Sequence, residues 1–165
     1  MAKIIVRTAL AMALLSLPMA AAAQDRPAPV AEFAVGWVGF ADDGIVSETM
    51  AGGSLRWYPL SRLAIGPEIL YIAGDNHSHL VLTGNLTFDL LANRAVTPFL
   101  VVGGGLFQTH ESFPSGGFTS NEGAFTLGGG VRGNVGERVT VGVDARIGWE
   151  THVRLNATVG IRLGQ

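Results

Sequence analysis

The chain has 165 residues, a formal net charge of −2 at pH 7 and no cysteine. The length suits one domain, and the lack of cysteine excludes a disulfide scaffold, a thiolate metal site and a lipoprotein anchor. The near-neutral charge gives no electrostatic basis for binding nucleic acid.

The first residues have the pattern of a secretory signal peptide. Lys3 and Arg7 make a basic start, Thr8–Met19 is an apolar run too short to span a membrane, and three alanines end at position 23. We therefore expect residues 1–23 to be a signal peptide that is cleaved after export through the inner membrane. Residues 24–165 are then expected to form the single domain.

Alternation of apolar and polar residues dominates the rest of the chain. A period of two is typical of strands with one apolar and one polar face, so we predict an all-β protein of eight strands. The predicted strands are, in order, Ala31–Phe40, Met50–Tyr58, Leu63–Ile72, His79–Leu90, Val96–Gln108, Gly123–Gly133, Val139–Trp149 and Val153–Leu163. In Val96–Gln108 both faces are apolar, and the alternation does not decide which one points inward.

The predicted connections alternate in length. Short turns are expected around Pro59, Asn93 and Gly136, and longer polar loops around Asp43, Asn76 and Ser115. The longest loop is predicted over Thr109–Asn121, which is rich in Ser and Gly and lacks a period of two. Short turns at one end and long loops at the other are typical of a bacterial outer-membrane barrel whose termini face the periplasm.

The two faces of the predicted strands differ in chemistry. One face is aliphatic and aromatic, with Trp and Tyr near strand ends, as in the interfacial girdles of a membrane barrel. The other face carries four acids and five arginines, namely Glu32, Arg56, Glu68, Asp89, Arg132, Asp144, Arg146, Arg154 and Arg162. Eight strands enclose a space that side chains just fill, so we predict a lumen plugged by these ion pairs. The alternative is a lipocalin-like soluble periplasmic binder with an apolar interior.

One stretch carries a family resemblance. Thr97–Phe107, TPFLVVGGGLF, resembles the Pro-aromatic-x-x-Gly-x-Gly pattern of the small eight-stranded outer-membrane barrels, the superfamily of the OmpA transmembrane domain and OmpX. This porin-like resemblance implies an antiparallel up-and-down transmembrane β-barrel in the outer membrane of a Gram-negative bacterium. It implies a monomer whose partners are outer-membrane lipid, lipopolysaccharide and the barrel assembly machinery, with no nucleic acid.

The histidines are the residues most capable of further chemistry. All four, His77, His79, His110 and His152, fall in or beside the predicted long loops. His77 and His79 share a face, and Asp75 or Glu111 could complete a metal site with them. No tight ligand motif is present, so we predict neither a metal nor another cofactor.

An enzyme is the remaining alternative. His77-Ser78 and His110-Glu111-Ser112 contain the residue types of an outer-leaflet lipid hydrolase. Adjacent residues on a strand point to opposite faces, which keeps such a pair apart, so we predict no catalytic residues. The function expected from the sequence is a structural or surface-interaction role at the cell surface, with specificity in Thr109–Asn121.

The last two predicted strands also fix a register. Their outward residues are all odd-numbered, so the connection between them must contain an odd number of residues. The predicted ladder places Ile147 opposite Leu155 and makes Arg146 and Arg154 diagonal neighbours. These two arginines would repel each other unless a carboxylate separated them, and we expect Glu32, Glu68 or Asp144 to do so.

Overall fold

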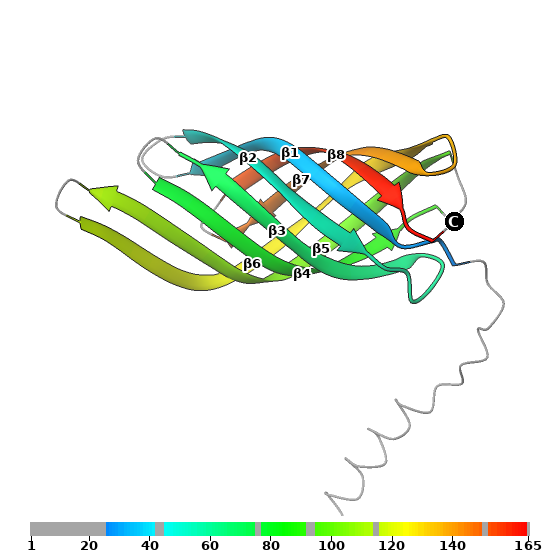
Figure 1. Cartoon of the computed structure of the whole chain (residues 1–165), viewed down its shortest axis with the longest axis horizontal. Coiled ribbons are helices and arrows are strands. Elements are labelled where there is room, and N and C mark those ends of the chain that lie inside the picture. The colour runs from blue at the N-terminus through cyan, green and yellow to red at the C-terminus, as the bar shows by residue number, and fades with distance from the viewer. Residues whose placement is uncertain are drawn as a thin grey trace, which may run out of the picture.

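Eight antiparallel strands close into one barrel in the computed structural model, which describes residues 26–41, 45–74, 77–91, 95–113, 116–149 and 152–164. Each strand pairs with its neighbours in the sequence, and β8 closes the barrel against β1 (Figure 1). The strands are β1 Val30–Ala41, β2 Ile45–Arg56, β3 Leu63–Ala73, β4 His77–Asp89, β5 Val96–Phe113, β6 Gly116–Val135, β7 Val139–Gly148 and β8 His152–Arg162. The predicted fold class is therefore confirmed, whereas the predicted signal peptide and the turn around Asn93 lie outside the described residues.

Burial follows the predicted alternation, and the apolar face is the exposed one, as a membrane barrel requires. On the last hairpin the side chains of Val143 and Val159 are 55% and 54% exposed, whereas Asp144 and Arg154 are 6% and 1% exposed. The structure also gives β5 a parity that the sequence left open: its odd-numbered residues point inward, Phe107 among them. A barrel with this distribution places its apolar side chains against its surroundings and its charges in its interior.

Aromatic side chains lie on the outer face, and Trp57, Tyr71 and Trp149 lie at or beside the ends of strands, as expected for an interfacial girdle. The side chains of Trp57, Tyr71, Phe125 and Trp149 are all more than half exposed. Among the described residues, no helix is long and apolar enough to cross a membrane.

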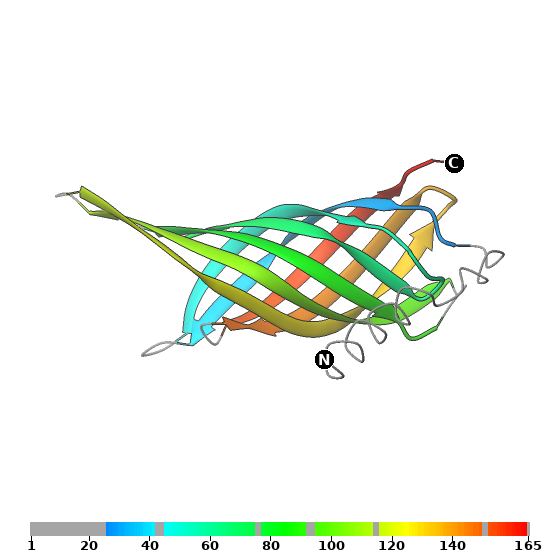
Figure 2. The same ribbon diagram turned by 90° about the horizontal axis from the view of Figure 1, so that it is seen from below.

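The predicted long loop over Thr109–Asn121 is wrong, because most of it is strand. β5 and β6 pair continuously to Phe113 and Gly116, and the resulting hairpin extends well beyond the rest of the barrel (Figures 1 and 2). A two-stranded ribbon that projects into solvent has no buried face, so its sequence need not alternate between apolar and polar residues. We call the end of the barrel that carries this hairpin the hairpin end, and the opposite end, where both described chain ends lie, the terminal end.

The register of the last hairpin agrees with the predicted parity but not with the predicted pairs. Ile147 faces Val153, two positions earlier than the predicted Leu155, and Arg146 lies directly opposite Arg154. The connection does have an odd number of residues, but it is centred one residue earlier than we predicted. Parity excludes odd shifts only, and a shift of two keeps every side chain on its proper face.

Candidate functional site in the barrel interior

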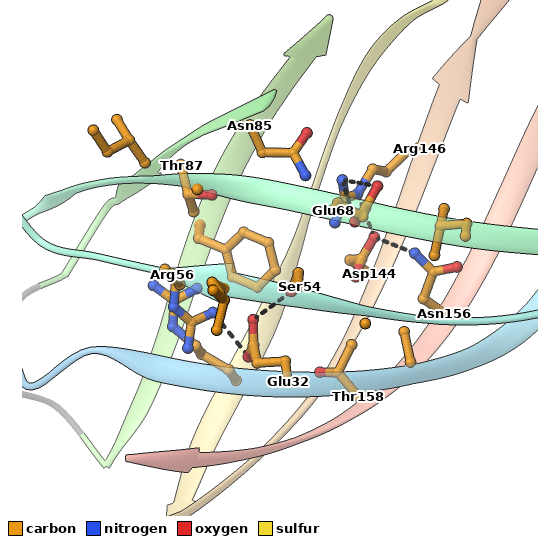
Figure 3. Close-up of a pocket in the computed structure, with 18 residues that line it drawn as sticks. Glu32, Ser54, Arg56, Glu68, Asn85, Thr87, Asp144, Arg146, Asn156 and Thr158 are labelled. Carbon is orange, nitrogen blue, oxygen red and sulfur yellow. Dashed lines mark hydrogen bonds and ion pairs between the residues drawn. The ribbon is translucent and has the colours of Figure 1, made fainter. Parts of the chain in front are cut away.

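The centre of the barrel holds a buried ion-pair network around Glu68 of β3. Arg154 Nη2 lies 2.6 Å from Glu68 Oε1, and Arg146 Nη1 lies 3.2 Å from Oε2. The Arg146 Nε–H also donates to Asp144 Oδ1 at 2.7 Å, and the same oxygen accepts a hydrogen bond from Asn156 at 2.9 Å. Figure 3 shows Glu68, Arg146, Asp144 and Asn156 converging from β3, β7 and β8. A carboxylate thus lies between the two facing arginines.

A second group of ion pairs lies nearer the terminal end. Arg56 Nη1 is 3.0 Å from Glu32 Oε1, and Arg132 pairs closely with Asp89. Arg132 also donates to the phenolic oxygen of Tyr58 at 3.0 Å. Glu32 and Arg56 join the neighbouring strands β1 and β2, whereas Arg132 of β6 reaches across the interior to Asp89 of β4 and to Tyr58 just after β2.

Eight of the nine charged residues predicted for the lumen thus pair with one another inside the barrel. Arg162 is the exception, since it lies at the terminal end of β8. Its guanidinium donates to Asn134 Oδ1 at 2.6 Å and to the Glu137 carbonyl at 2.9 Å. It therefore joins the β6–β7 turn to β8 and takes no part in the charged interior.

Glycines on β6 make room for the central network. Gly128 pairs with Arg146 across the ladder, and Gly130 pairs with Asp144. A Cβ at Gly128 would collide with the Ala145 carbonyl and lie 2.8 Å from the Arg146 Cγ. Gly128 and Gly130 thus leave room for the backbone of β7 and for its Arg146 and Asp144 side chains.

An apolar layer lies between the ion pairs and the hairpin end, and sequence reasoning missed it. The layer consists of Val38, Met50, Leu70, Ile72, Val81 and Phe107, all at most 4% exposed. Along β3 the inward residues run from Glu68 through Leu70 to Ile72, so the lumen changes from charged to apolar within one strand. The alternation in the sequence could have identified the layer, because on each strand these apolar residues have the same inward parity as the charged ones.

Little free space remains among the ion pairs. The cavity within the central network has a volume of about 40 Å³ and is lined by the charged and amide side chains of Figure 3. One water needs about 10–15 Å³ of such space, so this cavity holds a few waters.

The histidines divide into separate groups at the hairpin end. His77 and His79 lie beside Glu48 of β2, a residue that sequence reasoning overlooked because it assigned position 48 no strand. Glu48 has the inward parity of Met50, which would have identified it. The proposed partner Asp75 lies outside the described residues, and His110 lies 3.0 Å from Thr119 on the projecting hairpin.

The pairs considered for a hydrolase do not gain support from this arrangement. On β4 the odd-numbered residues point inward, so His77 and Ser78 belong to opposite faces. The side chain of Ser112 lies outside the described residues, and His110 is 3.0 Å from a threonine hydroxyl in an exposed position.

Solved structures of outer-membrane barrels share this fold. Neisserial surface protein A matches with a TM-score of 0.73 and 12% identity over 82% of this chain and 97% of its own. The N-terminal β-barrel domain of Pseudomonas aeruginosa OprF matches with a TM-score of 0.65 and 12% identity over 82% of this chain and 97% of its own. Ail, the attachment invasion locus protein of Yersinia pestis, matches with a TM-score of 0.58 and 9% identity over 82% of this chain and 96% of its own. No family model and no curated protein matches this chain.

The likeness to these structures shows the fold, that of the eight-stranded outer-membrane barrels, in agreement with the resemblance found in the sequence. At 9–12% identity it does not transfer a ligand or an activity.

Proposed function

We propose that this chain is an integral outer-membrane protein with a closed lumen, which presents the β5–β6 hairpin at the cell surface in a structural or interaction role. The observation that carries the proposal is the inverted burial of its side chains. Large aliphatic and aromatic residues are exposed on every strand, whereas Arg154, Glu68 and Asp144 are at most 6% exposed. Water would be a poor solvent for such an outer surface, and lipid is a good one.

The same inversion argues against the lipocalin-like alternative. A soluble binder buries its apolar residues around a ligand cavity and leaves its charges in water. Here the interior holds ion pairs and a thin apolar layer with only about 40 Å³ of free space among the charges. Neither the volume nor the lining suits an apolar ligand.

Closure of the lumen supports a role other than transport. The ion pairs are balanced and mutually bonded, and the apolar layer above them offers a permeating ion no polar contact. We therefore propose that the barrel is a scaffold. Outer-membrane lipid and lipopolysaccharide are its proposed contacts, the barrel assembly machinery is its proposed route of insertion, and the chain is proposed to act as a monomer without catalysis.

The β5–β6 hairpin supports the surface-interaction role. The ladder between β6 and β7 begins only at Thr126, so among the described strands residues 116–125 of β6 pair on the β5 side alone. Phe118 on this free edge is 61% exposed. A projecting strand with an unpaired edge is suited to binding an extended polypeptide by strand addition.

Cysteine labelling on intact cells tests the placement, since the native chain has no cysteine. A membrane-impermeant maleimide should label Phe118→Cys on the hairpin and leave Glu137→Cys, in the exposed β6–β7 turn, unlabelled until the cells are broken. The purified protein should also migrate differently on gels before and after boiling. Labelling of Glu137→Cys alone would mean the barrel is inverted, and recovery only from the soluble periplasm would reject the membrane location.

A further inference from the structure

We propose that Glu48, His77 and His79 bind a divalent transition-metal ion, with Zn²⁺ as the best fit, at the hairpin end of the barrel. One ligand atom from each residue lies within 4.8 Å of the other two. Tetrahedral Zn²⁺ binds such atoms at about 2.0–2.2 Å, so small side-chain rotations that separate His77 from Glu48 and bring His79 closer place all three in range.

The fold places these three side chains together and keeps a glycine beside them. Glu48 is on β2 and the two histidines are on β4, with β3 between them ending at Ala73. Gly74 follows, and a Cβ at this position would lie 2.6 Å from Glu48 Oε1 and 2.8 Å from His77 Nε2. Any other residue would therefore crowd the ligands.

The buried carboxylate of Glu48 is the observation that points to a cation ligand. Its side chain is 2% exposed, and among the described residues neither carboxylate oxygen accepts a well-formed hydrogen bond. The oxygens instead face ring nitrogens: His77 Nε2 is in close contact with Oε1, and His79 Nε2 is 3.8 Å from Oε2. A buried carboxylate without donors is costly, and an ion shared with two imidazoles compensates its charge.

The surroundings of His79 suit a metal ligand. Its Nδ1 lies 3.0 Å from the Thr109 hydroxyl, so an Nδ1–H that donates to Thr109 leaves the Nε2 lone pair directed at the site. The rings of Phe107 and Phe40 pack against the imidazole, with centroids 4.9 Å and 5.2 Å away. The ring is thus fixed in orientation and shielded from water on its inner side.

The ligand set selects the metal. Two imidazole nitrogens and one carboxylate suit Zn²⁺ and its neighbours in the first transition row, whereas Ca²⁺ and Mg²⁺ prefer oxygen ligands alone. Three protein ligands leave a fourth position open. The site adjoins an open pocket of about 470 Å³ that Glu111, the cross-strand partner of His77, also lines. Water from this pocket is available to fill the fourth position.

Calorimetry on the untagged mature chain, refolded in detergent, tests the proposal. We expect one Zn²⁺ to bind per chain at pH 7.5, with no comparable heat from Mg²⁺. Glu48→Gln and His77→Gln should each abolish this binding, and Thr109→Val should weaken it about 10-fold because it removes the partner of His79. Bound Co²⁺ should show the intense ligand-field absorption of a tetrahedral site, which adventitious surface binding does not give.

His110→Gln on the projecting hairpin is the matched control and should bind Zn²⁺ as the unaltered chain does. Gel mobility before boiling checks that each variant is folded, and if Glu48→Gln does not fold, His77→Gln at the partly exposed mouth decides the question. Failure of the unaltered chain to bind Zn²⁺ would reject the site and leave Glu48 and His77 as an ion pair. Equal loss of binding in His110→Gln would equally overturn the proposal.

Discussion

Replacing Glu68 by glutamine should be among the most damaging single changes that keep the shape of a side chain. Glu68 lies 2.6 Å from one arginine and 3.2 Å from another, and these two arginines face each other across the β7–β8 ladder. At an effective dielectric constant of about 20, the two attractions amount to about 6 and 5 kcal/mol before desolvation is counted. Glu68→Gln removes both and leaves the repulsion between Arg146 and Arg154.

The net loss is smaller than this sum, because Asp144 still pairs with Arg146 Nε at 2.7 Å. Arg154, 1% exposed, is then left without a charged partner among the described residues. Leaving one buried partner of a broken ion pair uncompensated costs about 3–5 kcal/mol, so we expect Glu68→Gln to lower the free energy of unfolding by that amount. Arg154→Met added to Glu68→Gln should restore most of the loss, since it removes the orphaned charge.

Reversible urea unfolding in lipid vesicles, followed by tryptophan fluorescence, measures these differences. Glu122→Gln is the control, because Glu122 is an exposed acid on the projecting hairpin whose loss should cost less than about 0.5 kcal/mol. If Glu68→Gln proved as mild as this control, the central ion pairs would not be what holds the interior together. If the double variant had a lower free energy of unfolding than Glu68→Gln, the unpaired charge of Arg154 would not be the cause of the lost stability.

Three further changes test other parts of the structure in the same unfolding assay. Val143→Arg, on the outer face near mid-strand, should cost about 2–4 kcal/mol, whereas Val135→Arg at the end of β6 should cost about 0–1 kcal/mol; equal costs would contradict the placement in a bilayer. Arg162→Ala, at the terminal end, should cost at most about 1 kcal/mol and far less than Arg154→Ala, unless Arg162 belongs to the central network after all. Replacing residues 112–117 by Asn-Gly should change the free energy of unfolding by less than about 1 kcal/mol, because the described residues of the tip pair only across the β5–β6 ladder; a larger loss would give the tip a structural role.

The sequence was sufficient for the barrel because one physical constraint acts on nearly every residue of a spanning strand. In the proposed membrane placement an outward side chain meets apolar surroundings, so the parity of Val143 and Asp144 can be read directly from their chemistry. Register is subject to a weaker constraint. A shift of two residues leaves that parity intact, and only the geometry of the connection decides that Arg146 faces Arg154.

The projecting hairpin and the histidine site escaped prediction for related reasons. Beyond the rim of the barrel the strands are no longer divided between lipid and lumen, so Thr109–Asn121 could not be distinguished from a loop by period. Glu48 was missed because β2 extends five residues further than the alternation indicated, to Ile45. The histidines were noticed, but their acidic partner comes from a strand two places away in the barrel, and no local spacing in the sequence records that contact.

The layered interior determines how the proposed metal site can be reached. Glu48 and His79 lie on the hairpin-end side of the apolar layer, and the ion pairs lie on the other side. Crossing that layer would strip an ion of its ligands with nothing to replace them, since Phe107 and Leu70 are fully buried and carry no polar atoms in their side chains. An ion bound at Glu48 must therefore arrive from the hairpin end and leave by it. The site is suited to capture or to bridging a surface partner through its open position, and it is not suited to passing a metal through the membrane.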